Sequence, residues 1–201
     1  MELSNIIAAR RSIRKFKQED LALETVQLLL EAARLAPSAS NLQPWRFVVA
    51  KSPSVKEMLG HCTPYKFMAK AAVIFICCVD LTTLTTRQRR MGELLAAGVF
   101  EGIEIDTGDT SIYTSTIMDA EAAKAYLSMN AAIAVEHIAL KAVDLGLGSC
   151  WIGRFDRDKV KEVLALDEQI HPVVLLPVGR PAQSPAARPR LTMDQIVLKS
   201  L

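Results

Sequence analysis

The stretch PSASNLQPW, residues 37–45, guides the interpretation of this chain, because prolines restrain the backbone near both ends of a loop of small and amide residues. The bulky run WRFVVA follows from Trp45, which predicts that the loop leads directly into a β-strand. Hydroxyl, amide and backbone groups held in one geometry could recognise the polar edge of a heterocycle. An ordinary polar turn is the alternative interpretation of these residues.

Helices and buried strands are expected on both sides of this loop. Apolar residues at helical spacing predict helices over residues 2–11, 21–35, 52–62 and 156–164, the second of which ends before Pro37. Continuous apolar runs predict buried strands over residues 71–80, expected to be central, and 172–178, with a shorter strand over 149–152. The pattern predicts an α+β fold with a helix-covered sheet, forming a single domain over residues 1–201.

Residues 120–145 form the longest predicted helix, and apolar side chains cover nearly its whole circumference. Such a helix must be buried all round, either in the domain core or against a second subunit. Gly146 is expected to end it, since glycine readily adopts the left-handed conformation. The periodicity is weaker between residues 81 and 119, where a helix-like stretch over 87–95 leads to a polar segment over 107–116. We interpret residues 81–119 as a variable insertion or lid.

The composition argues against several classes of partner. The 24 basic and 22 acidic residues leave a net charge of +2, so neither nucleic acid nor a membrane surface is an expected partner. The longest apolar run, over residues 71–79, is far shorter than the roughly 20 residues that span a bilayer. No segment has the pattern of a secretory signal, and we expect a soluble, cytoplasmic protein with reduced cysteines. The three histidines are far apart in the sequence, and no metal site is predicted.

Arginines gather near both ends of the chain. Arg10, Arg11, Ser12 and Arg14 could together bind a phosphate, because guanidinium groups match phosphate oxygens in geometry and charge. The alternative is that basic residues here complement the dipole at the end of the first helix. Arg188 and Arg190 resemble solvated surface charge when considered alone.

The segment GLGSCWIGRF, residues 146–155, places small residues around a strand end, where a planar ligand could approach the backbone. It does not match a dinucleotide-binding turn, because Trp151 stands at the third glycine position and the segment follows a helix. A thiol enzyme using Cys150 is a weaker alternative, since no histidine is near it in sequence.

Taken in order, four blocks of sequence resemble the nitroreductase superfamily over almost the full chain. They are RRSIRKF from Arg10, APSASNLQPWRF from Ala36, GLGSCWIGRF from Gly146 and RPRL from Arg188. The resemblance implies a mixed, mostly antiparallel central sheet flanked by helices. It also implies an intertwined homodimer that holds two FMN molecules at its interface.

The resemblance also implies roles for individual residues. The FMN phosphate and ribityl end would be bound by residues from both ends of the chain: Arg10, Arg11, Ser12, Arg14, Arg188 and Arg190. The isoalloxazine would lie along Pro37, Ser38, Ala39 and Asn41, with part of this loop serving the partner's flavin. Gly153 and Arg154 would place backbone N–H groups near flavin N5 and O4. No catalytic side chain is implied, because flavin N5 carries the chemistry.

The implied reaction is a ping-pong hydride transfer from NADH or NADPH, through FMN, to an electron-poor acceptor such as a nitroaromatic or a quinone. Other flavin reactions on this fold are one alternative: reductive dehalogenation, enone reduction or fragmentation of the flavin. A flavin-binding protein without turnover is another. No segment encodes a dedicated nucleotide site, so the sequence does not identify the preferred nicotinamide or the physiological acceptor. Pro64 and Tyr65 stand where family members often carry an amide pair, so the sequence does not say what this segment contacts at the substrate or the flavin edge.

Overall fold

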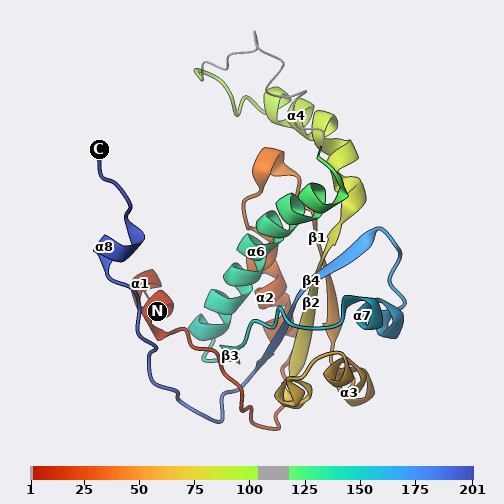
Figure 1. Cartoon of the computed structure of the whole chain (residues 1–201), viewed down its shortest axis with the longest axis vertical. Helices are drawn as coiled ribbons and strands as arrows, with labels where there is room; N and C mark the ends of the chain where they lie inside the picture. The colour runs from red at the N-terminus through yellow and green to blue at the C-terminus, as the bar shows by residue number, and fades with distance from the viewer. Residues whose placement is uncertain (1, 104–117) are drawn as a thin grey trace.

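A four-stranded antiparallel sheet forms the centre of the computed structural model, which describes residues 2–103 and 118–201 (Figure 1). The strands lie in the order β1 (Trp45–Ala50), β2 (Val73–Asp80), β4 (Ile170–Gly179) and β3 (Gly148–Ser149). Within the described residues, the one parallel contact is a bridge between Ser12 and Ser149. The predicted α+β fold with a mostly antiparallel sheet is confirmed.

Strand β2 is central, as predicted, since it lies between β1 and β4 in the sheet. Helices cover both of its faces. Val73 and Phe75 face α2 (Leu23–Arg34) and α6 (Ala120–Asp144), whereas Ile74 and Ile76 face α3 (Pro53–His61) and α7 (Arg157–Leu164). All four of these strand side chains are fully buried. Burying one large aliphatic or aromatic side chain contributes about 1.5–3 kcal/mol, so the alternating faces of β2 hold the two helical layers on the sheet.

Several predicted boundaries differ from the structure by one or two residues, and the end of the first helix and the length of β3 differ because of long-range pairing. Helix α1 spans Leu3–Ala9 rather than residues 2–11, because the chain extends at Arg10 so that the Ile13 N–H donates to the Ser149 carbonyl at 2.9 Å. The predicted strand over 149–152 continues β3 only as far as Ser149, and Ile152 forms an isolated bridge with Leu175. Pro177, opposite this gap, has no N–H to donate, which interrupts the ladder.

The long helix α6 is buried on one side only in the single chain. Its Leu127, Ala131 and Ile138 side chains are fully buried, whereas Met129 is 61% exposed and Ile133 is 38% exposed. The helix ends as predicted: Gly146 has a φ of +69°. The Leu147 N–H then donates to the Ala142 carbonyl at 2.7 Å, closing the helix with the two bonds of a Schellman motif.

Short elements complete the fold. They are η1 (Ala39–Asn41), η2 (Lys66–Lys70), η3 (Leu81–Thr86), α4 (Arg87–Ala96) and α8 (Met193–Ile196). Helix α4 matches the helix-like stretch expected over 87–95, whereas the polar segment over 107–116 lies outside the described residues. The C-terminal tail carries α8 away from the body of the molecule (Figure 1). Among the helices of the described ranges, none has the length and apolarity needed to cross a membrane.

Candidate functional site

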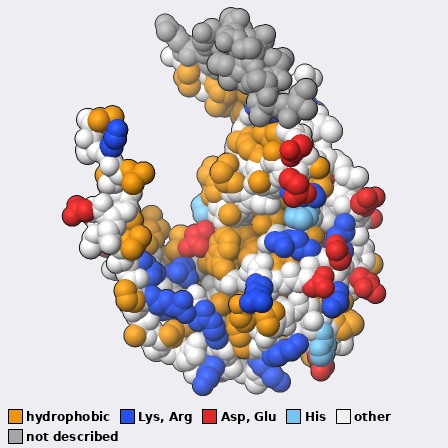
Figure 2. Space-filling model, viewed as in Figure 1, with side chains coloured by type: hydrophobic (Ala, Val, Ile, Leu, Met, Phe, Trp, Pro, Cys, Tyr) orange, Lys and Arg blue, Asp and Glu red, His pale blue; other side chains and the backbone are white. Residues whose placement is uncertain are grey.

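The two ends of the chain run side by side and bring arginines together. The Lys17 N–H donates to the Arg180 carbonyl at 2.9 Å, and the Ala182 N–H donates to the Lys15 carbonyl at 2.9 Å. These bonds hold the start of the tail against the segment that follows α1. Figure 2 shows Lys and Arg side chains gathered where these segments lie, beside an apolar surface.

Cys150 lies close enough to this cluster to be influenced by its charges. Burial raises the pKa of the Cys150 thiol, and Arg14, Arg10 and Arg188 act in the opposite direction through their positive charge. The Ser12 side chain also interacts with this thiol. The structure therefore brings four of the sequence-predicted phosphate ligands, three of them arginines from opposite ends of the chain, to one place.

Two of the predicted arginines point elsewhere. The Arg11 guanidinium donates to the carbonyls of Ala8 at 2.5 Å and Arg10 at 2.8 Å. The Arg190 guanidinium lies near the carbonyls of Arg188 and Pro189, at 3.4 and 3.3 Å. Arg10 itself forms an ion pair with Glu136 of α6, with 3.6 Å between Nε and Oε1. Arg10 thus lies beside α6.

The loop that precedes β1 has a strained backbone. Ser40, Asn41 and Gln43 have φ values of +50°, +51° and +47°, although none of them is glycine. Residues held in such conformations persist when their surroundings fix them, and they cluster at functional sites. The Gln43 N–H donates to Ser38 Oγ at 2.9 Å, and Gln43 Nε2 donates to Asn41 Oδ1 at 2.7 Å.

Asn130 of α6 fixes the other side of this loop. Its Oδ1 accepts a hydrogen bond from the Ala39 N–H at 2.7 Å, while its Nδ2 donates to the Tyr126 carbonyl at 2.8 Å. The Asn130 side chain is 2% exposed. The sequence prediction missed this residue, and the available signal was a lone amide within an otherwise apolar helical segment.

The segment after β3 leaves an open surface. A Cβ added at Gly153 would meet no atom within 4 Å, and the Arg154 side chain is exposed. Thr63 Oγ1 donates to the Arg154 carbonyl at 2.9 Å, and Thr63 itself is buried. Residues 63–65, where the family often has an amide pair, are therefore joined to Arg154 through Thr63. The sequence prediction missed this threonine.

Comparisons with known proteins identify the family of this chain. The family model described as the nitroreductase family matches residues 7–180. The chain belongs to the nitroreductase family. An NADH dehydrogenase of Thermus thermophilus is 30% identical over 191 residues, which cover 94% of this chain and 91% of that protein. An NADPH-dependent oxidoreductase of Staphylococcus aureus is 27% identical over 198 residues, which cover 96% of this chain and 70% of that protein.

Solved structures share the nitroreductase fold. A protein of Exiguobacterium sibiricum described as a nitroreductase, solved in complex with FMN, has a TM-score of 0.81 and 23% identity, covering 98% of this chain and 96% of that one. A nitroreductase-like protein of Streptococcus mutans has a TM-score of 0.81 and 22% identity, covering 96% of each chain. At these identities the likeness supports the fold.

Proposed function

We propose that this nitroreductase-family chain is an FMN-dependent NAD(P)H oxidoreductase. The observation that carries the proposal is the arginine cluster of Arg10, Arg14 and Arg188 around Cys150, close in sequence to the open surface at Gly153. The NADH and NADPH activities named for the relatives from T. thermophilus and S. aureus support the same reaction class.

The donor groups fit the phosphate end of FMN. Guanidinium groups from both chain ends, together with the Ser12 side chain, influence the same buried thiol and so lie in one region. Ser149 Oγ is buried beside them without a hydrogen-bond partner among the described residues, as expected of a group kept for a ligand. In this proposal Arg10, Ser12, Arg14 and Arg188 hold the phosphate, whereas Arg11 and Arg190 join after their side chains rotate.

The loop and the Gly153 segment would hold the ring end. Pro37, Ser38, Ala39 and Asn41 would lie along the isoalloxazine, and the strained backbone presets their positions. The backbone N–H groups of Gly153 and Arg154 would stabilise negative charge on the ring edge. When bound, FMN supplies two-electron redox chemistry, accepting a hydride equivalent from the nicotinamide and passing it to the acceptor.

We further infer a ping-pong order of substrates at the open surface around Gly153. Gly153 has no side chain, and no atom lies within 4 Å of where a Cβ would stand, so a planar molecule can lie against its backbone. The nicotinamide donor would occupy this surface first and leave. An electron-poor acceptor, such as a nitroaromatic or a quinone, would then take its place.

Exposed apolar surface supports a homodimer. Met129 and Ile133 are exposed on α6, and in the tail Leu191, Met193, Ile196 and Leu198 are between 58% and 95% exposed. Large exposed apolar side chains in clusters mark interaction surfaces. A second copy of the chain that covers α6 would also bury the helix all round, as its sequence pattern requires.

Replacing an arginine of the cluster tests the flavin assignment. Arg14→Ala should weaken FMN binding by about 10- to 100-fold, because a charge-assisted hydrogen bond contributes about 1.5–3 kcal/mol. Arg34→Ala is the matched control, since Arg34 pairs with Glu31 on the exposed face of α2. Flavin fluorescence titration measures both constants. Equal FMN affinity of wild type and Arg14→Ala would refute the phosphate assignment.

A further inference from the structure

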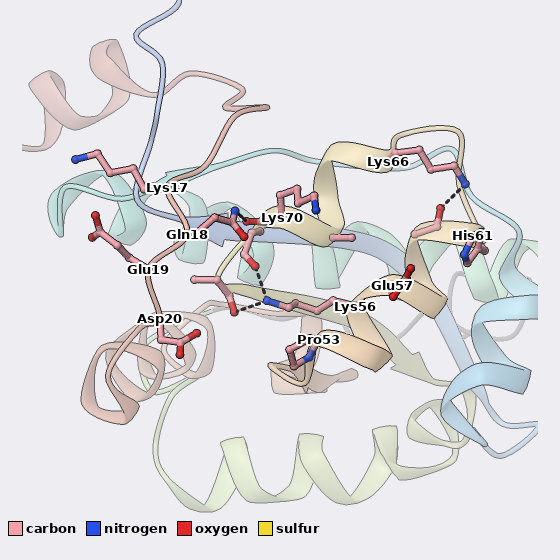
Figure 3. Close-up of a pocket in the computed structure, with 14 residues that line it drawn as sticks. Lys17, Gln18, Glu19, Asp20, Pro53, Lys56, Glu57, His61, Lys66 and Lys70 are labelled. Atoms are coloured by element: carbon pink, nitrogen blue, oxygen red, sulfur yellow. Dashed lines mark hydrogen bonds between the residues drawn. The ribbon is translucent and has the colours of Figure 1, made fainter.

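A cavity of about 510 Å³ lies between the segment of residues 17–20, helix α3 and η2 (Figure 3). Its lining shares no residue with the proposed flavin-binding set. Lysines and carboxylates from three separate parts of the chain surround it. The cavity is therefore independent of the flavin proposal.

Lys56 of α3 is a buried amine in the wall of this cavity. Its side chain is 8% exposed, and its Nζ donates to the Ala71 carbonyl at 2.7 Å and the Ala72 carbonyl at 3.3 Å (Figure 3). An ammonium group has three N–H donors. Among the described residues, no further acceptor bonds the third donor.

Lys56 also lacks a close countercharge. No carboxylate of the described residues forms an ion pair with it, although Asp20 lines the same cavity. Burial lowers the pKa of Lys56, and the more distant Asp20 partly opposes that effect. A buried charge is costly unless it is paired, so an anion in the cavity would stabilise this amine.

The remaining charges of the cavity select the kind of anion. The charged residues of the lining are four lysines and three carboxylates: Lys17, Lys56, Lys66, Lys70, Glu19, Asp20 and Glu57. They carry one more positive than negative charge, which matches a monoanion. A phosphate dianion would meet three carboxylates and no arginine among these residues.

We propose that this cavity binds a small monocarboxylate, whose carboxylate accepts the third hydrogen bond of Lys56 Nζ. The volume leaves room for the remainder of the molecule beyond its carboxylate. The bound ligand would join α3 to the segment of residues 17–20, which is itself bonded to the tail through Lys17.

Calorimetric titration of the purified, FMN-saturated protein tests the proposal. The probes are sodium acetate, sodium benzoate and sodium phosphate, with sodium chloride at equal ionic strength as the reference. We expect a monocarboxylate to bind more tightly than phosphate. Absence of monocarboxylate binding, or tighter binding of phosphate, would overturn the proposal.

Two substitutions locate the site. Lys56→Met keeps the apolar stem and should weaken monocarboxylate binding by at least about tenfold, whereas Lys161→Met should leave it unchanged because Lys161, on α7, lies outside the cavity lining. Asp20→Asn removes a competing negative charge and should tighten binding, which keeps the proposal testable if Lys56→Met does not fold. Unchanged affinity in Lys56→Met, or in Asp20→Asn, would refute the assignment. None of these outcomes depends on whether NAD(P)H is oxidised.

Discussion

Removing the Asn130 amide should loosen the strained loop that we place along the flavin. In Asn130→Ala, the Ala39 N–H loses its acceptor at 2.7 Å, and the Tyr126 carbonyl loses a donor at 2.8 Å. One lost hydrogen bond costs about 1 kcal/mol, and leaving a partly buried N–H unpaired adds about 1–3 kcal/mol. We therefore expect the unfolding free energy to fall by about 2–4 kcal/mol.

The effect on FMN should follow from the same contacts. Left-handed conformations at Ser40, Asn41 and Gln43 cost about 1–3 kcal/mol each and depend on their surroundings. If the loop relaxes when Asn130 no longer holds it, FMN must reorder it, and we expect about tenfold weaker binding.

Urea unfolding followed by circular dichroism, and fluorescence titration with FMN, measure the two effects. Ser128→Ala is the matched control on α6, since Ser128 makes no side-chain hydrogen bond among the described residues. A variant with reduced stability but unchanged FMN affinity would refute the proposed role of this loop in flavin binding.

Four further predictions concern the rest of the site. Thr63→Val should slow NAD(P)H oxidation and Thr63→Ser should keep it near the wild-type rate, because only a hydroxyl can donate to the Arg154 carbonyl. Equal rates in all three proteins would show that Thr63 does not position the segment at Arg154. Gly148→Ala should lower the unfolding free energy measured in urea by about 1–3 kcal/mol, since its Cβ would lie 2.8 Å from Ile13 Cβ. Gly92→Ala is the control, because a Cβ there has open space and should not be destabilising. An equal loss of stability in both variants would contradict this prediction. Deleting residues 191–201 should shift a dimer to monomer in light scattering while keeping Arg188 and Arg190; an unchanged mass would exclude the tail from the interface. At pH 8 all four thiols should react slowly with Ellman's reagent, because burial raises each pKa and suppresses the reactive thiolate; a fast thiol at Cys150 would favour the thiol-enzyme alternative.

The sequence predicts the core elements well because their patterns are local. Strand β1 matches Trp45–Ala50, and the apolar run that becomes β2 needs no partner to be recognised. The end of α1 and the length of β3 were wrong because both depend on pairing between residues far apart in sequence, Ile13 with Ser149 and Cys150 with Pro177. Periodicity within a segment carries no information about such pairs.

For the candidate site too, features that are local in sequence were predicted, whereas features that depend on distant residues were not. The arginines near both chain ends stand out in the sequence, and the structure places Arg10, Arg14 and Arg188 around one thiol. The supporting residues Asn130 and Thr63 were missed, because each acts on a backbone group 91 positions away in the chain. The cavity at Lys56 was equally hidden, since its walls come from segments that only the fold brings together.

The most direct test of the central claim is purification under native conditions, followed by a visible spectrum and anaerobic titration with NADH and NADPH. We predict a yellow dimer with one FMN per chain, bleached rapidly by a reduced nicotinamide and recoloured by an electron-poor acceptor. Yellow protein that no nicotinamide bleaches would indicate a flavin carrier or sensor. A colourless protein that ignores added FMN would contradict the account.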